Sequence, residues 1–310
     1  MNELRIVPFL PSATEMVCAL GLADHLIGIT HECDYPPEIA NKPIVVRNAL
    51  PLAGMGLREI DAAVSARIRS GASLYQVDDL LLQELAPTLI LTQNLCQVCA
   101  PSGNEITQLL KSLRPTPQIL WLTPRSLAGI EENLRELGKA TGRLKEAEAV
   151  IASGQARLEK VSALTRNAST RPRVFSMEWV DPSYCSGHWV PEMVELAGGI
   201  DALSRKGTDS VRIEWQDVLR WAPEVLIISP CGYNLARAME QAVNLVGYPG
   251  WDDLPAVRRN RVYAVDANSY FARPGPRVVE GVELLARLIH PEICDWKEPR
   301  NAFQNVRADQ

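Results

Sequence analysis

The sequence lacks an excess of basic residues and lacks any long apolar run. Lysine and arginine together number 32 against 37 aspartates and glutamates, which gives a net charge of −5. A broad basic field is therefore absent, and this argues against non-specific nucleic-acid binding. No stretch approaches the roughly 18 apolar residues that a membrane helix needs. We expect neither a nucleic-acid partner nor a membrane-embedded segment.

Recognisable enzyme signatures are also missing. The chain contains no GxxxxGK[ST], GxSxG or HExxH motif, and the first expected strand–helix turn, PFLPSATE, has no glycine-rich dinucleotide fingerprint. A binding protein is therefore favoured over an enzyme. The start, MNELRIVPFLPSATE, has neither a basic n-region nor an apolar h-region. If the chain is complete, we expect no secretory signal.

The residues that are present indicate an α/β fold. With 310 residues and a 46% hydrophobic share, the chain is long enough for two domains. Short apolar runs alternate with helical patterns, which is typical of lobes built on mostly parallel sheets. The expected strands are 5–9, 26–30, 88–93, 118–123, 173–179, 224–230 and 261–266.

Two short motifs recur in the same order in both halves. Glu-Met-Val occurs at 15–17 and 192–194, in each case with a glycine four residues after the valine. Ala-Pro occurs at 86–87 and 222–223. Each copy has the same strand–helix context, so we predict two related lobes. The first half holds additional residues between its motifs, and these include 31–78.

A helical stripe of leucine, isoleucine, valine and alanine covers 126–165, with a stop and restart at Thr141-Gly142. The second piece, about 143–165, would be roughly 33 Å long. We expect it to be a rigid strut that limits closure of the lobes. The predicted domains are an N-terminal lobe at 1–125, a helical strut at 126–168 and a C-terminal lobe at 169–310.

Aromatic and polar residues gather in the loops that follow the predicted strands. Ligands of open parallel sheets bind outside the carboxyl ends of the strands, so we expect these loops to meet at a cleft between the lobes. Core aromatics that cap the strand ends, and an arginine ion pair at the last helix, are the structural alternatives. The candidate ligand contacts are Tyr35, Trp179, Trp189, Tyr233, Tyr270, Phe271 and Arg273.

Sulfur and imidazole side chains follow the same pattern. Cys96-x-x-Cys99 has a metal or redox spacing, although structural zinc usually uses two close pairs and the sequence has one. A bound transition metal, a thiol or disulfide pair, and inert packing all remain open. The candidate metal ligands are His31, Cys33, Cys96, Cys99, Cys185, His188 and Cys231.

Three segments carry a family resemblance. The string RIVPFLPSATEMVCALGLADHLIGITHECDYPP at 5–37 resembles the opening of the cobalamin and iron-siderophore substrate-binding proteins of ABC transporters. LAPTLI at 85–90 is similar to that family's strand entry, with Thr88 in place of the usual aspartate. GHWVPEMVELAGG at 187–199 resembles its second-lobe helix. The resemblance covers about 4–290 and implies two α/β lobes bridged by a long helix.

The resemblance also implies a function. It implies non-enzymatic binding of a corrinoid, such as cobalamin, or of a related metal chelate, and an ABC permease as partner. Tyr35 and either Tyr270 or Phe271 match positions that line the corrin cleft in the cobalamin binders. The cysteine-rich loops and the missing signal indicate a cytoplasmic subgroup, with a periplasmic receptor and an upstream start as the alternative. A metal-binding or redox enzyme on the same scaffold is the other alternative.

Overall fold

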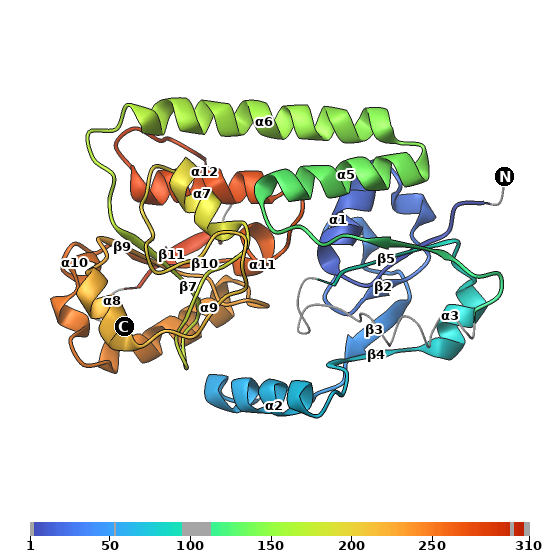
Figure 1. The fold of residues 1–310 in the computed structure, drawn as a ribbon, viewed down its shortest axis with the longest axis horizontal. Helices are drawn as coiled ribbons and strands as arrows, with labels where there is room; N and C mark the ends of the chain where they lie inside the picture. Colours follow the sequence, from blue (N-terminus) through green and yellow to red (C-terminus); the bar gives the residue numbers. More distant parts are fainter. Residues whose placement is uncertain (1–2, 53, 95–112, 298–300, 307–310) are drawn as a thin grey trace. The chain divides into compact units, whose positions relative to one another are not determined.

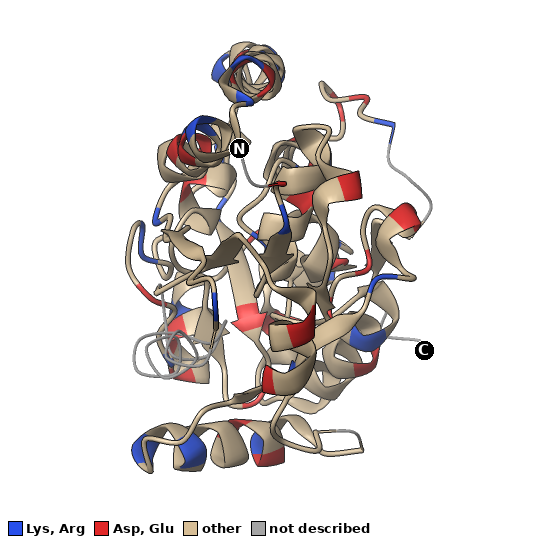
Figure 2. Cartoon of the chain, turned by 90° about the vertical axis from the view of Figure 1, so that its right-hand side faces the viewer, with Lys and Arg blue, Asp and Glu red and all other residues tan. Residues whose placement is uncertain are grey.

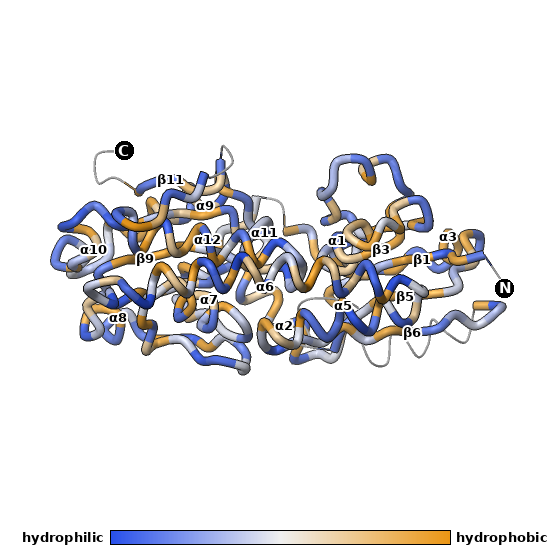
Figure 3. Tube along the Cα trace, turned by 90° about the horizontal axis from the view of Figure 1, so that it is seen from above, coloured by the Kyte–Doolittle hydropathy of each residue, from blue (hydrophilic) through white to orange (hydrophobic). Residues whose placement is uncertain are grey.

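A computed structural model describes the chain except residues 1–2, 53, 95–112, 298–300 and 307–310. The chain divides into two compact units. The N-terminal unit comprises Met1–Pro124 and Ala128–Ile151, and the C-terminal unit comprises Arg125–Leu127 and Ala152–Gln310. Both units are α/β, which confirms the predicted fold class. Strands are mainly apolar (Figure 3), and acidic and basic residues lie largely on helices and loops (Figure 2).

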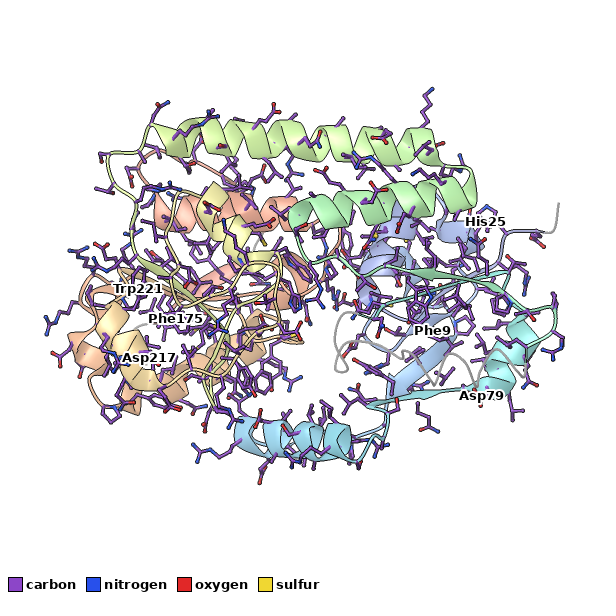
Figure 4. The ribbon with its side chains drawn as sticks, viewed as in Figure 1. Phe9, His25, Asp79, Phe175, Asp217 and Trp221 are labelled. Atoms are coloured by element: carbon purple, nitrogen blue, oxygen red, sulfur yellow. The ribbon has the colours of Figure 1, made fainter. Side chains whose placement is uncertain are left out.

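The central sheet of the N-terminal unit is parallel. β1 (Ile6–Pro8) pairs with β5 (Leu89–Thr92), which pairs with β6 (Gln118–Trp121). All three strands were expected from their apolar runs. Phe9, labelled in Figure 4, directly follows β1 and belongs to the same buried hydrophobic cluster as Ile90. Helix α1 (Pro11–Ala19) begins at a proline, whose fixed φ suits the first helical position.

A second small sheet in the same unit includes two strands from residues 31–78, the segment that has no counterpart between the motifs of the second half. β2 (Ile29–Thr30) pairs in parallel with β3 (Ile44–Asn48), and β3 pairs antiparallel with β4 (Tyr75–Val77). β3 and β4 were not predicted, because neither is a long apolar run. The helices of this region are η1 (Ala23–His25), η2 (Pro37–Ile39), α2 (Leu57–Arg69) and α3 (Asp79–Leu85).

The C-terminal unit is built on a five-stranded sheet with the order β11-β10-β9-β7-β8. The strands are β7 (Val174–Trp179), β8 (Tyr184–Cys185), β9 (Val225–Ile228), β10 (Val262–Val265) and β11 (Phe303–Asn305). β7, β9 and β10 are parallel, and the two edge strands are antiparallel. Phe175 of β7, labelled in Figure 4, is fully buried.

Helices accompany this sheet in the predicted alternation (Figure 1). α12 has the largest buried face of these helices. The helices are α7 (Val190–Leu196), α8 (Trp215–Trp221), α9 (Leu235–Ala242), η3 (Val243–Gly247), η4 (Trp251–Asp253), α10 (Pro255–Arg258), α11 (Ala267–Tyr270) and α12 (Val278–Ile289).

The helical stripe forms α5 (Leu127–Thr141) and α6 (Leu144–Arg166), as the stop and restart predicted. Gly142 lies between them with φ of +71°, a left-handed conformation that favours glycine. Residues of α6 up to Ile151 belong to the N-terminal unit and the rest to the C-terminal unit. In the latter, Arg157 donates two hydrogen bonds to Glu283 of α12, at 2.9 and 2.6 Å.

The recurring Ala-Pro motif has one structural role in both units. Ala86 ends α3 and Ala222 ends α8, and both have left-handed backbones, with φ of +41° and +50°. Proline follows and cannot continue the helix, and a buried parallel strand begins two residues later. The two lobes are therefore related in local structure as well as in sequence.

Candidate functional site

The loop after β2 in the N-terminal unit is anchored by a buried thiol. Cys33 Sγ lies 3.0 Å from Thr14 Oγ1 of α1 and 3.3 Å from Thr30 Oγ1 of β2. The backbone N–H of Cys33 also donates to Thr30 O. These contacts hold the loop between the helix and the strand, so Cys33 has a structural role.

Cys18, on the last turn of α1, is a poorly ionised thiol. Burial, followed by the nearby Glu15 carboxylate, raises the pKa of Cys18 to about 11. A thiol is nucleophilic and ligates metals as its thiolate, so Cys18 is unreactive at neutral pH.

His31 lies in the same loop and has one ring nitrogen engaged. Its Nδ1 is 3.2 Å from the carbonyl oxygen of Val46 on β3, and its backbone N–H donates to the same carbonyl. A carbonyl oxygen only accepts, so the proton of the neutral ring sits on Nδ1. Nε2 is buried and has no hydrogen-bond partner. The nearest acidic atom, Glu32 Oε1, is 3.9 Å away.

Tyr35 ends this loop as an exposed aromatic residue. It has 44% of its surface accessible, whereas Phe9 in the core of the same unit has 1%. Ligand contact by Tyr35 stays a prediction.

The carboxyl ends of β7 and β9 in the C-terminal unit carry a second aromatic group. The rings of Trp179 and Tyr233 meet edge to face, with centroids 5.4 Å apart, and the guanidinium of Arg237 lies 4.0 Å from the Tyr233 ring centre. Trp179 donates its indole N–H to Asp181 O. Trp179 is half-buried, and Tyr233 is 5% exposed. In this cluster Trp179 is the partly accessible ring, packed on the buried Tyr233 beside a cation.

Glu178 precedes this tryptophan and receives hydrogen bonds from two loops. Ser210 Oγ donates to Glu178 Oε1 at 2.6 Å, and the backbone N–H of Gly187 also donates to the carboxylate. Burial raises the pKa of Glu178, and the charge of Asp209 raises it further, while these two hydrogen bonds lower it. Burial has the largest effect, so the pKa stays above the ordinary value.

His188, in the same unit, has a partner for its Nε2 atom. It lies 3.1 Å from Asp209 Oδ1, and Arg125 approaches the same oxygen at 3.5 Å. Burial lowers the pKa of His188, and the hydrogen bond with Asp209 opposes that effect. The backbone of His188 has φ of +52°, in the left-handed region.

Four of the predicted ligand contacts lie in the interior of the C-terminal unit. Trp189 is 4% exposed and donates its indole N–H to Phe271 O at 2.8 Å. Phe271, Tyr270 and Arg273 are also buried. Burial of the three aromatic residues agrees with the alternative that they pack in the core, and ligand contact for all four residues stays a prediction.

The predicted metal ligands do not form a cage within the described part of the chain. There, no three His, Cys, Asp or Glu side chains gather closely enough to hold a metal ion. Cys185 is fully buried, and Cys231 is exposed. Cys96 and Cys99 lie outside the described residues, so the metal site stays a prediction.

Sequence reasoning missed three contributors to these loops: Thr14, Ser210 and Arg237. Arg237 lies in the first turn of α9, four residues after Tyr233, which precedes the helix, so this contact is at least local in the sequence. Ser210 reaches Glu178 across 32 residues, and Thr14 reaches Cys33 across 19. No local pattern marks either contact.

Comparison with known proteins identifies the family to which this chain belongs. The family model described as "Periplasmic binding protein" matches residues 6–269. The chain therefore belongs to the periplasmic binding protein family, and the predicted resemblance is confirmed. None of the described helices is long and apolar enough to cross a membrane.

Particular relatives share most of the length of the chain. It is 26% identical to the uncharacterized ABC transporter substrate-binding lipoprotein YvrC of Bacillus subtilis, over 93% of this chain and 80% of that protein. It is 25% identical to a vitamin B12-binding protein of Vibrio cholerae, over 90% and 86%. A periplasmic heme-binding protein from Pseudomonas aeruginosa has the same fold, with a TM-score of 0.73, 19% identity and coverage of 98% and 99%.

Proposed function

We propose that this chain binds a corrinoid without chemically transforming it, as the substrate-binding component of an ABC-type uptake system. The observation that carries the proposal is the pair of aromatic surfaces at the carboxyl ends of strands. Tyr35 is exposed in the N-terminal unit, and Trp179 with Tyr233 forms the partly accessible cluster in the C-terminal unit. The vitamin B12-binding relatives, aligned over about nine-tenths of the chain, support the choice of ligand.

Physical chemistry favours aromatic contacts for such a ligand. Burial of apolar surface contributes about 25 cal/mol per Å² before the costs of ordering. A corrin macrocycle is broad and carries amide side chains at its rim. Trp179 supplies the partly exposed apolar face, the buried Tyr233 ring packs beside it, and Arg237 supplies a donor that suits amide oxygens.

An ABC permease is the proposed partner, because the family delivers small molecules to such permeases. The location of the chain follows from that role: a receptor works on the side of the membrane from which the permease takes its ligand. The cytoplasmic location expected from the start of the sequence stays a prediction. Localisation of the tagged chain in its own organism separates the two placements.

Calorimetry on the full chain tests the proposed ligand. Aquocobalamin and cobinamide are titrated first, followed by ferric haem and a ferric siderophore. We expect saturable heat with a corrinoid and none with the siderophore. No heat with either corrinoid overturns the proposal. Tighter binding of haem than of both corrinoids would mean that the ligand is haem and not a corrinoid.

The Tyr35→Ala variant tests the site in the N-terminal unit. We expect corrinoid affinity to fall by about tenfold, equivalent to ~1.4 kcal/mol, because an exposed aromatic face is lost. Leu80→Ala is the control, since Leu80 is an exposed apolar side chain of the same unit, 79% exposed in α3, and is not a predicted ligand contact. Equal affinities of the two variants would remove Tyr35 from the site.

A further inference from the structure

His31 holds an unused lone pair in the N-terminal unit. The Nδ1–H of its neutral ring donates to Val46 O, so Nε2 carries a lone pair and no proton. That atom is buried without a hydrogen-bond partner. A buried polar atom without a partner costs free energy, so a ligand that uses it recovers that cost.

The other three histidines, all within the described residues, lack this feature. His188 Nε2 meets Asp209 Oδ1 at 3.1 Å, and His290 Nε2 meets Gly198 O at 3.3 Å. His25 Nδ1 meets Leu4 O at 3.0 Å, and its ring has no buried unsatisfied nitrogen. His31 alone among them has one nitrogen fixed by a carbonyl and the other buried without a partner.

This arrangement matches that of a metal-ligating histidine. Such residues usually donate their other ring N–H to a backbone carbonyl or a carboxylate, which fixes the tautomer and raises the basicity of the ligating nitrogen. Val46 O provides that bond here. The described residues contain no three-donor cluster for a bare ion. A metal chelate brings its own equatorial donors and needs a single nitrogen from the protein.

We propose that His31 Nε2 is an axial ligand to the metal of the bound chelate, an inference that rests on the proposed function. The lone pair of Nε2 forms the new bond to the metal, and the axial water of the chelate leaves to solvent. No electron or proton is transferred. Nε2 is covered in this structure, with Glu32 Oε1 3.9 Å away, so neighbouring side chains must move before the chelate reaches it.

Visible spectra of the full chain with diaquocobinamide and with ferric haem provide the first test. We expect bands of a nitrogen-ligated metal in the wild type and of a water-ligated metal in His31→Ala, with affinity lower by about tenfold. Free imidazole should restore the wild-type spectrum. His25→Ala is the matched control, because His25 also uses Nδ1 on a backbone carbonyl of the same unit.

Electron paramagnetic resonance tests the bond without a substitution. Cob(II)inamide bound to the wild type should show three-line splitting from one axial ¹⁴N, and incorporation of ¹⁵N-histidine should convert it to two lines. His31→Gln, which keeps a donor for Val46 O, should lose the splitting. This measurement holds even if His31→Ala fails to fold.

The outcomes separate the two claims. Binding heat with a corrinoid, together with spectra that are identical in the wild type and His31→Ala, overturns the axial ligand and leaves the proposed function intact. Nitrogen ligation with haem alone supports His31 and overturns the corrinoid. Absence of binding heat with every chelate overturns both.

Discussion

His31 and His188 lie in loops of different units and meet different surroundings. In the C-terminal unit, His188 is enclosed by the segment that carries Gly207 and Asp209. The N–H of His188 donates to Thr208 O at 2.7 Å, Gly207 donates to His188 O, and Asp209 meets the ring. In the N-terminal unit, Nδ1 of His31 bonds to a single carbonyl, and Nε2 has no hydrogen-bond partner, with Glu32 Oε1 3.9 Å away.

This difference separates a loop whose polar groups are satisfied internally from one with spare bonding capacity. Glu178 is similarly satisfied, by Ser210 and Gly187. The C-terminal loops therefore provide a rigid frame for Trp179 and Tyr233. The loop after β2 is tethered through Cys33 and keeps one nitrogen available. The two loops therefore differ in how fully their own unit satisfies their polar groups.

The largest effect should come from filling the close approach at Gly187. A Cβ there would lie 2.4 Å from Thr208 O and 2.6 Å from Ser210 N, both of them backbone atoms that cannot rotate away. Gly187→Ala should lower the free energy of unfolding by about 2–3 kcal/mol, because the two loops must separate. Urea unfolding measures it.

Gly247→Ala is the control for that experiment, since a Cβ at Gly247 meets nothing within 4 Å. We expect a change within about 0.5 kcal/mol. Equal stability of the two variants would show that the segments around Gly187 and Thr208 can separate at little cost, and that the C-terminal loops are not tightly packed.

A smaller effect should come from removing the tether of the N-terminal loop. Cys33→Ala leaves the hydroxyls of Thr14 and Thr30 without their shared partner and opens a small void. We expect the free energy of unfolding to fall by about 1–2 kcal/mol. Cys231→Ala, at an exposed thiol, should change it by less than about 0.5 kcal/mol. A neutral Cys33→Ala would mean that the loop is held by other contacts.

The contrast also explains what the sequence could and could not predict. Buried parallel strands such as β5 and β9 are uninterrupted apolar runs, and the helices beside them have clear starts and stops, so the fold was readable. Residue type placed aromatic side chains near strand ends but could not distinguish a core position, such as that of Trp189, from an accessible one, such as that of Tyr35. The free nitrogen of His31 depends on Val46 of a strand that the pattern did not reveal.

The smallest effect concerns the pH dependence that Glu178 gives to the C-terminal unit. Burial raises its pKa above the usual 4.5 in the folded chain. Between 4.5 and that raised value the folded chain holds more protons than the unfolded chain, so the free energy of unfolding falls as pH rises. Glu178→Gln cannot titrate, and its stability relative to the wild type should therefore increase as pH rises through this window. Urea unfolding at stepped pH values measures the difference.

Ser210→Ala sharpens this measurement. The Ser210 hydroxyl stabilises the charged form of Glu178, so its loss should raise the pKa further and steepen the fall in stability with pH. Asp209 remains in every variant, so its charge affects them equally. Parallel curves for the wild type and Glu178→Gln would mean that the carboxylate is well solvated. The C-terminal loops would then be less fully satisfied within their own unit than this contrast requires.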